Sequence, residues 1–119
     1  MPETRSIVIN TTPLIALSAA MGSLDVLKVM YDRVIVPKEV VDELHAGGQE
    51  AMGWAEFQAA NWIERRTEEA KIIAYVRNAL DRGEAAVVQT ALDENIERVC
   101  VDEAVERRVA RLCGLTVSG

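Results

Sequence analysis

The acidic residue with the most informative surroundings is Glu84. It lies in the segment Arg82–Leu92, where the apolar residues Val88, Ala91 and Leu92 follow it by four, seven and eight positions. On a helix these offsets fall on one face, so we expect Glu84 to point along the apolar stripe. An ionised carboxylate that faces a core is costly unless a cation or strong donors meet it. A metal ion held by several acids would meet that need.

Three further oxygen-bearing residues fall where such an ion could be held. Asn10 directly follows the apolar run Ser6–Ile9, and Asp102 directly follows Val99–Val101. If both runs are parallel strands, these residues lie at the carboxyl ends, where open sheets bind their ligands. Glu43 flanks the apolar stripe of another predicted helix, near enough to its edge to reach around it. Three carboxylates and one amide oxygen are suited to Mg²⁺ or Mn²⁺.

The elements that must position these residues alternate between strands and helices. We expect buried strands at 6–9, 34–36, 99–101 and 115–117, with a short extended stretch at 62–63. Between them the pattern predicts helices over 13–20 (capped by Thr12), 24–30 (capped by Ser23), 37–44, 50–60, 68–80, 84–92 and 103–113, with Gly83 separating two of them. Such alternation predicts crossovers and an α/β doubly wound parallel sheet flanked by helices.

Length and composition indicate one domain over residues 1–119. Half of the residues are apolar and 27% are charged, but only 4% are aromatic, so the core must be aliphatic. The net charge of −6 argues against broad electrostatic adhesion to nucleic acid. It does not exclude a nuclease, because bound divalent cations would offset the acids. No apolar run approaches the roughly 20 residues of a membrane span and no signal peptide is evident, so we expect a cytoplasmic protein.

Four segments resemble, in order, the successive motifs of PIN domains, nearest to the branch of VapC-type toxins. They are Asn10–Leu17, Val36–Leu44, Arg82–Val87 and Val101–Arg107, and the resemblance runs from Ile7 to Gly119. It implies a metal-dependent ribonuclease with an acidic cluster, usually a homodimer and often restrained by a cognate antitoxin. Carried over by motif, the acidic positions are Asn10, Glu43, Glu84 and Asp102. Arg107 also matches its motif, and would contact the RNA phosphate or support the cluster.

Two departures from the family pattern bear on activity. Relatives commonly have Asp where this chain has Asn10, which removes one negative charge from the site. Most relatives also continue past the last predicted strand, so the chain is expected to be short at its C-terminus. Both departures leave open a catalytically weak or inactive PIN-like binding module. A phospho-acceptor signalling domain would need an acidic pair after the first strand and a lysine after the last, and the sequence has neither.

Each candidate also has an ordinary structural explanation. Asn10 could form an Asx-turn with the amide of Thr12. Glu43 could be a solvated helix residue, and Glu84 could interact with the helix dipole. Asp102 could cap the helix that follows it. Arg107 could pair with Glu103, four residues before it.

Overall fold

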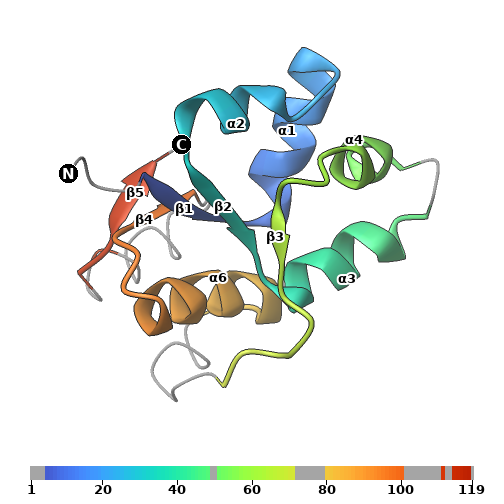
Figure 1. The fold of residues 1–119 in the computed structure, drawn as a ribbon. Coiled ribbons are helices and arrows are strands. Elements are labelled where there is room, and N and C mark those ends of the chain that lie inside the picture. Colours follow the sequence, from blue (N-terminus) through green and yellow to red (C-terminus); the bar gives the residue numbers. More distant parts are fainter. Residues whose placement is uncertain (1–4, 49–50, 72–79, 101–110, 112–113, 119) are drawn as a thin grey trace.

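A five-stranded parallel sheet forms the centre of the molecule (Figure 1). The computed structural model describes residues 5–48, 51–71, 80–100, 111 and 114–118. The strands are β1 (Ser6–Ile9), β2 (Arg33–Val36), β3 (Glu64–Arg65), β4 (Arg98–Cys100) and β5 (Thr116–Ser118), in the order β3-β2-β1-β4-β5. The predicted α/β fold is therefore confirmed. Because the strand order changes direction between β1 and β4, the carboxyl ends of these two strands form the switch point of the sheet.

The last three residues of β1 and of β2 are apolar and buried because helices cover both faces of the sheet. Val8, Ile9, Ile35 and Val36 are completely buried. A strand buried on both faces reads as a continuous run of β-branched residues rather than an alternating pattern. This is why β1 and β2 are found close to their predicted bounds.

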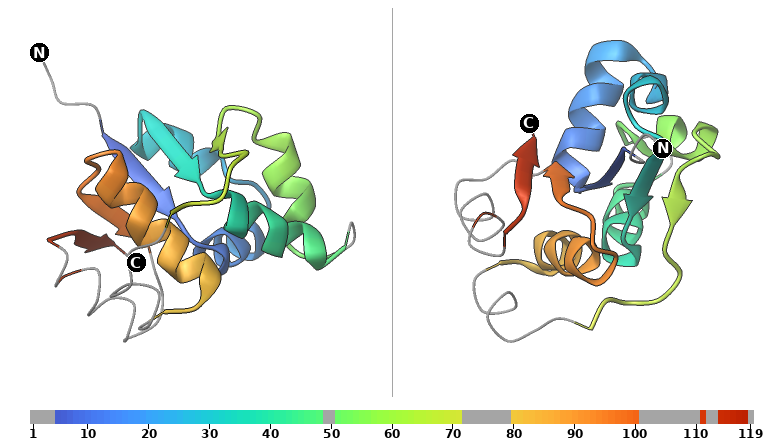
Figure 2. Two further views of the ribbon diagram at one scale, coloured as in Figure 1. Left: turned by 90° about the horizontal axis from the view of Figure 1, so that it is seen from below. Right: turned by 60° about the vertical axis from the view of Figure 1, so that its left-hand side comes forward.

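The helices form two layers around the sheet. Figures 1 and 2 show α1 (Thr11–Met21) and α2 (Asp25–Met30) on one side and α6 (Arg82–Asp93) on the other. Helix α3 (Lys38–Ala46) contacts both α1 and α6. Helix α4 (Trp54–Ala59) buries Phe57 in the core. No helix in the described ranges is long and apolar enough to cross a membrane.

Two predicted helix starts are wrong because a side chain caps the helix earlier. The N-cap of α1 is Asn10 and not Thr12, since the Asn10 side chain accepts a hydrogen bond from the Thr11 amide. The N-cap of α6 is Asp81, so Gly83 lies inside the first turn of this helix and does not precede it. The N-cap of α2 is Leu24, one residue after the predicted Ser23, although Ser23 Oγ accepts a hydrogen bond from the Asp25 amide at 3.3 Å.

Two other predicted helices differ for reasons of backbone geometry. Helix α4 begins at Trp54 rather than residue 50, because Gly53 has φ +98°, a left-handed conformation that a continuing helix cannot contain. Residues 68–71 of the predicted 68–80 helix are not helical, since the Ala70 amide donates to the Glu39 carboxylate instead. The short strand β3 follows the predicted stretch by two residues. Residues 72–79, and the predicted helix 103–113 apart from Arg111, lie outside the described ranges.

Candidate active site

The carboxyl ends of β1 and β4 are joined directly. The backbone amide of Asn10 donates to the carbonyl of Cys100 at 3.2 Å. The carboxyl ends of these two strands therefore lie at the same edge of the sheet, where Asn10 and Asp102 were expected. Asp102 and Arg107 lie outside the described residues, so their convergence on this edge stays a prediction.

Asn10 is a buried helix cap at this edge, with only 6% of its surface exposed. Its Oδ1 accepts a hydrogen bond from the Thr11 amide at 2.8 Å, one residue earlier than the expected Asx-turn. Capping satisfies one of the amides that the first turn of α1 leaves without a helical partner. Asn10 thus has the structural role of an N-cap, and the bond to the Thr11 amide, rather than to the expected Thr12 amide, fixes its side-chain oxygen at the end of β1.

Glu43 is brought to the same place from α3. Its Oε2 accepts from the Thr11 hydroxyl at 3.0 Å. A Cβ atom on Gly83 would lie 3.0 Å from Glu43 Oε2 and 3.6 Å from Asn10 Oδ1. The first turn of α6 therefore approaches both oxygens, and a side chain at position 83 would crowd them. Two of the predicted site residues are brought together by α1, α3 and α6.

Glu84 belongs to a capping box at the start of α6. The Asp81 carboxylate accepts from the Glu84 amide at 2.9 Å, and Glu84 Oε2 accepts from the Asp81 amide at 3.4 Å. Val88 and Ala91 are buried as expected, but Glu84 itself is only half-buried, and this contact directs one of its oxygens toward the first turn. The spacing Asp-x-x-Glu is a capping signature, so the sequence itself contains a signal for Asp81 as the N-cap of this helix.

Two cations lie at the rim of this site, each paired with acids. Lys38 lies 2.7 Å from Asp42, and Arg82 lies 2.6 Å from Glu69 and 3.8 Å from Asp42. The hydrogen bond from Lys38 lowers the pKa of Asp42 below its usual range, and the same bond raises the pKa of Lys38. Acids for a metal and cations for a phosphate therefore occur side by side.

These residues surround a hollow of about 370 Å³ between α3 and α6, which we call the site hollow. Its lining residues are Glu39, Asp42, Glu43, Ala46, Arg82 and Gly83. Thr11, Arg82 and Glu39 were not predicted to lie at this site. All three stand inside the four motif segments, but nothing in one sequence distinguishes them from their neighbours.

Comparison with known families identifies the family to which this fold and site belong. A family model described as a PIN domain matches residues 6–119. This chain belongs to the PIN-domain family. A search of curated proteins found no match. PIN domains are generally nucleases and typically use divalent metal ions.

The described part of this PIN domain fits a divalent cation in the chemistry of its donors. Glu43 and Asn10 offer hard oxygen ligands near one point, and Mg²⁺ is commonly bound through one or two carboxylates while it keeps several waters. Within the described ranges, however, there is no group of three or more histidine, cysteine, aspartate or glutamate side chains that could hold a metal. A fuller site requires Asp102, the acidic residue that the fourth motif supplies after β4.

Proposed function

We propose that this PIN domain is an endoribonuclease that hydrolyses RNA phosphodiester bonds with Mg²⁺ or Mn²⁺. The observation that carries the proposal is the approach of the Glu43 and Asn10 side-chain oxygens to Gly83 at the switch point of the sheet. A carboxylate oxygen and an amide oxygen at this end of a parallel sheet could hold a metal ion that binds a phosphodiester. Such a site is consistent with a family whose members are generally nucleases. The family assignment supports nuclease activity in general, and RNA as the substrate is our proposal.

Each of the predicted site residues has a role in this proposal. Glu43, Glu84 and Asp102 would hold the ion, and Asn10 would coordinate it or position a water. When bound, the metal supplies an activated water at neutral pH and stabilises charge on the phosphate. The Thr11 hydroxyl holds the Glu43 carboxylate in place through its hydrogen bond.

The cations of the site would bind the substrate. Arg82 lies at the rim of the site hollow, and Arg107 follows Asp102 in the fourth motif. A guanidinium suits phosphate because its N–H groups can form two parallel hydrogen bonds. No side chain has to act as the nucleophile, since water attacks the phosphate.

A second candidate is a catalytically weak or inactive PIN-like binding module. The observation that favours it is the use of Asn10 as a neutral cap, because an amide oxygen binds a cation less strongly than a carboxylate does. Such a module would bind RNA or a protein without cutting, and would bind Mn²⁺ poorly.

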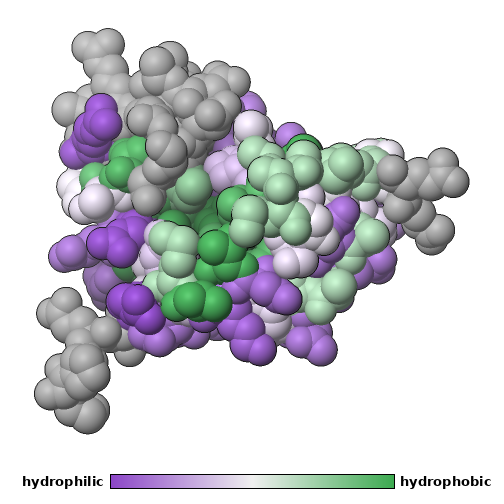
Figure 3. All heavy atoms as spheres, turned by 90° about the horizontal axis from the view of Figure 1, so that it is seen from above, coloured by the Kyte–Doolittle hydropathy of each residue, from purple (hydrophilic) through white to green (hydrophobic). Residues whose placement is uncertain are grey.

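We also propose that the protein is cytoplasmic, is the toxin of a toxin–antitoxin pair and forms a homodimer. Support for the homodimer comes from an apolar face on the outer side of α1 and α2 (Figure 3). In the described ranges, the large apolar side chains that are exposed all lie on these helices or on the turn before α4: Ile15, Met21, Val29, Met30 and Met52. Exposed apolar residues gathered on one face mark a protein interface more often than chance.

The nuclease proposal is tested by cleavage of single-stranded RNA with the purified chain. We expect cleavage in Mg²⁺ or Mn²⁺ and none in EDTA, and we expect Asp102→Asn to abolish it. The matched control is Asp25→Asn, which removes the same charge from an exposed position on α2. Cleavage that persists in EDTA or in the Asp102→Asn variant would contradict the mechanism, and an inactive parent that binds Mn²⁺ poorly would favour the binding module.

A further inference from the structure

Glu39 is a buried carboxylate for which the proposed chemistry has no role. It lies one helical turn before Glu43 on α3, with only 4% of its surface exposed. Its Oε2 accepts a hydrogen bond from the Ala70 amide at 2.9 Å. Its Oε1 is buried and has no hydrogen-bond partner among the residues that the structure describes. A buried acceptor without a donor is destabilising, so this oxygen is poised to accept an N–H group that enters from outside.

Glu39 lines two neighbouring hollows. One is the site hollow, and the other, which we call the outer hollow, has a volume of about 310 Å³ and includes Arg66, Glu69 and Thr90. Arg82 bridges them, because it pairs with Asp42 of the site hollow and with Glu69 of the outer hollow. A ligand in the outer hollow would therefore lie next to the candidate metal site. Both volumes fall at the lower end of the range for ligand pockets.

The charges of the outer hollow disfavour phosphate and favour N–H donors. Its acidic residues outnumber its cations, which are Arg66 and Lys71, and Arg66 is already paired with Glu94. A phosphate there would face repulsion from the excess carboxylates. The outer hollow is also a poor binding site for a metal ion, since no group of three metal-binding side chains occurs among the described residues. A neutral group with N–H donors meets neither difficulty.

We propose that the Glu39 carboxylate recognises, by hydrogen bonding, a guanine base next to the cleaved phosphate. This inference rests on the proposed function, in which RNA occupies the adjacent site. Guanine presents two neighbouring donors, N1–H and the N2 amino group, and an ionised carboxylate is purely an acceptor. Uracil presents one N–H between two carbonyl oxygens, which a carboxylate repels. Single-stranded bases are commonly recognised on this edge.

The carboxylate of Glu39 can meet such a base with little movement. Its terminal torsion is a broad, roughly two-fold rotation, so turning the group toward the outer hollow leaves the backbone of α3 in place. Because Oε1 is closed off from water, no solvent hydrogen bond has to be broken first. The base therefore gains a charge-assisted hydrogen bond in a partly desolvated setting, where such bonds are strong.

Binding of short RNAs tests the proposal without relying on cleavage. Fluorescence anisotropy would compare uncleavable 2′-O-methyl tetranucleotides that differ only in one base: guanine, inosine, adenine, cytosine or uracil. We expect the parent to bind the guanine RNA roughly tenfold or more tightly than the uracil RNA, a difference of about one charged hydrogen bond. Inosine lacks the N2 amino group and should fall between them.

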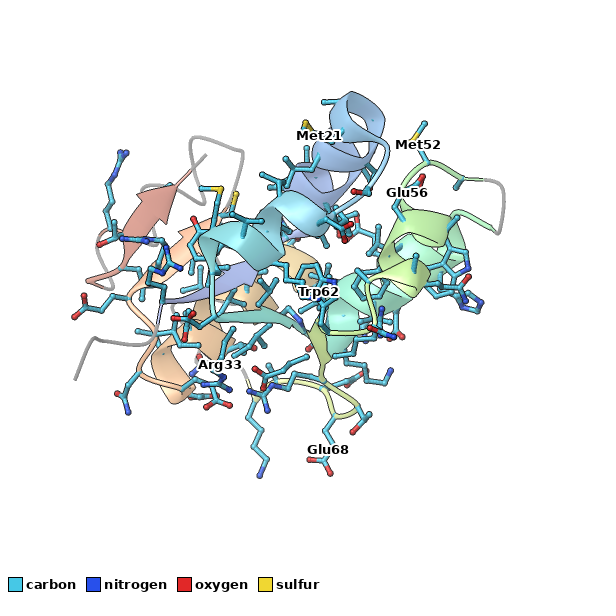
Figure 4. All side chains as sticks on the ribbon, turned by 45° about the horizontal axis from the view of Figure 1, so that its top comes forward. Met21, Arg33, Met52, Glu56, Trp62 and Glu68 are labelled. Carbon is cyan, nitrogen blue, oxygen red and sulfur yellow. The ribbon has the colours of Figure 1, made fainter. Side chains whose placement is uncertain are left out.

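Glu39→Gln should remove the preference for guanine. Glutamine keeps an oxygen for the Ala70 amide but replaces the unpartnered acceptor with a donor, and a thermal melt checks that the variant folds. Glu68→Gln is the matched control, because Glu68 lines the same hollow but points away from the protein body (Figure 4). It should keep the preference.

Each outcome separates this inference from the proposed function. A parent that binds guanine and uracil RNAs equally, or a Glu39→Gln variant that keeps the guanine preference, overturns the inference even if RNA is cleaved. So does a Glu39→Gln variant that loses Mn²⁺ binding while its base preference is unchanged, since Glu39 would then hold a cation. A parent that prefers guanine but never cleaves RNA supports the inference and contradicts the nuclease proposal.

Discussion

At the scale of single residues, two side-chain oxygens lie close to Gly83: that of Asn10 at the end of β1 and that of Glu43 on α3. Glu39 lies one helical turn before Glu43 and is buried, although nothing local in the sequence distinguishes it from the other acids on α3. Its burial depends on Ala70, which follows it by 31 residues and donates the hydrogen bond that closes over it. Long-range contacts of this kind are not visible in a helical pattern.

Asn10→Asp is expected to strengthen metal binding. Aspartate is an equally good helix cap, so the bond to the Thr11 amide is retained and α1 should begin at the same residue. The added charge lies close to the Glu43 carboxylate, so the metal-free variant should be less stable than the parent. We expect Mn²⁺ affinity to rise by about tenfold, which corresponds to about 1.4 kcal/mol.

Calorimetric titration with Mn²⁺ and denaturant melts with and without Mn²⁺ measure both effects. Asn10→Ser is a suitable control, since serine also caps helices but offers no carboxylate. If Asn10→Asp binds Mn²⁺ no better than the parent, the side chain at position 10 serves only as the N-cap of α1 and does not coordinate the metal.

At the scale of helices and strands, apolar runs predicted the elements and missed their boundaries. The runs at β1 and β2 are continuous and β-branched over three residues each, and both strands were found. Boundaries depended on single residues whose effect is geometric: Gly53 delays α4, and Asp81 starts α6 early. The strand β3 has only two residues, and its position follows its pairing with β2, in which Ile35 is opposite Glu64. A strand of two residues is too short to show a recognisable run of apolar residues.

The pairing of β2 with β3 should make stability depend on pH. Arg33 donates two hydrogen bonds to Glu64, at 2.7 and 2.9 Å, and the pKa of Glu64 is lowered chiefly by this bonding. A folded-state pKa below the unfolded value of about 4.3 stabilises the protein above that value. This contribution is lost as pH falls through the folded pKa. Both side chains are more than one-third exposed, so we expect less than about 1 kcal/mol.

Thermal melts between about pH 6 and pH 3 of the parent and of Glu64→Gln measure the contribution. The parent should be the more stable at pH 6, and the difference should shrink toward pH 3. Added salt should also reduce it, because exposed charges are screened. Glu68→Gln, at an exposed position without a described ion pair, should follow the parent. A constant difference across this pH range would show that the pair does not stabilise the sheet.

At the scale of the whole molecule, the alternation of apolar strands and helices predicted the sheet and its two helical layers but not the surface that α1 presents. Helix α1 contains no charged residue, and Ile15, Ala16, Ala19, Ala20 and Met21 are all exposed. A helix that is apolar on all sides is normally buried. The chain has a net charge of −6, so two copies repel each other over most contacts. They repel least where they meet through an uncharged face, which favours α1 as the surface between two copies.

Met21→Glu should therefore convert a dimer into a monomer. Met21 is 61% exposed at the end of α1 and points outward in Figure 4, so the substitution leaves the core intact. In a symmetric dimer each change occurs twice, and two added carboxylates would be desolvated without a partner, at a cost of several kcal/mol. Met21→Leu keeps the apolar surface and should remain dimeric. Sedimentation equilibrium at micromolar concentrations distinguishes the two states. A parent that sediments as a monomer, or a Met21→Glu variant that stays dimeric, would show that this face does not join two copies.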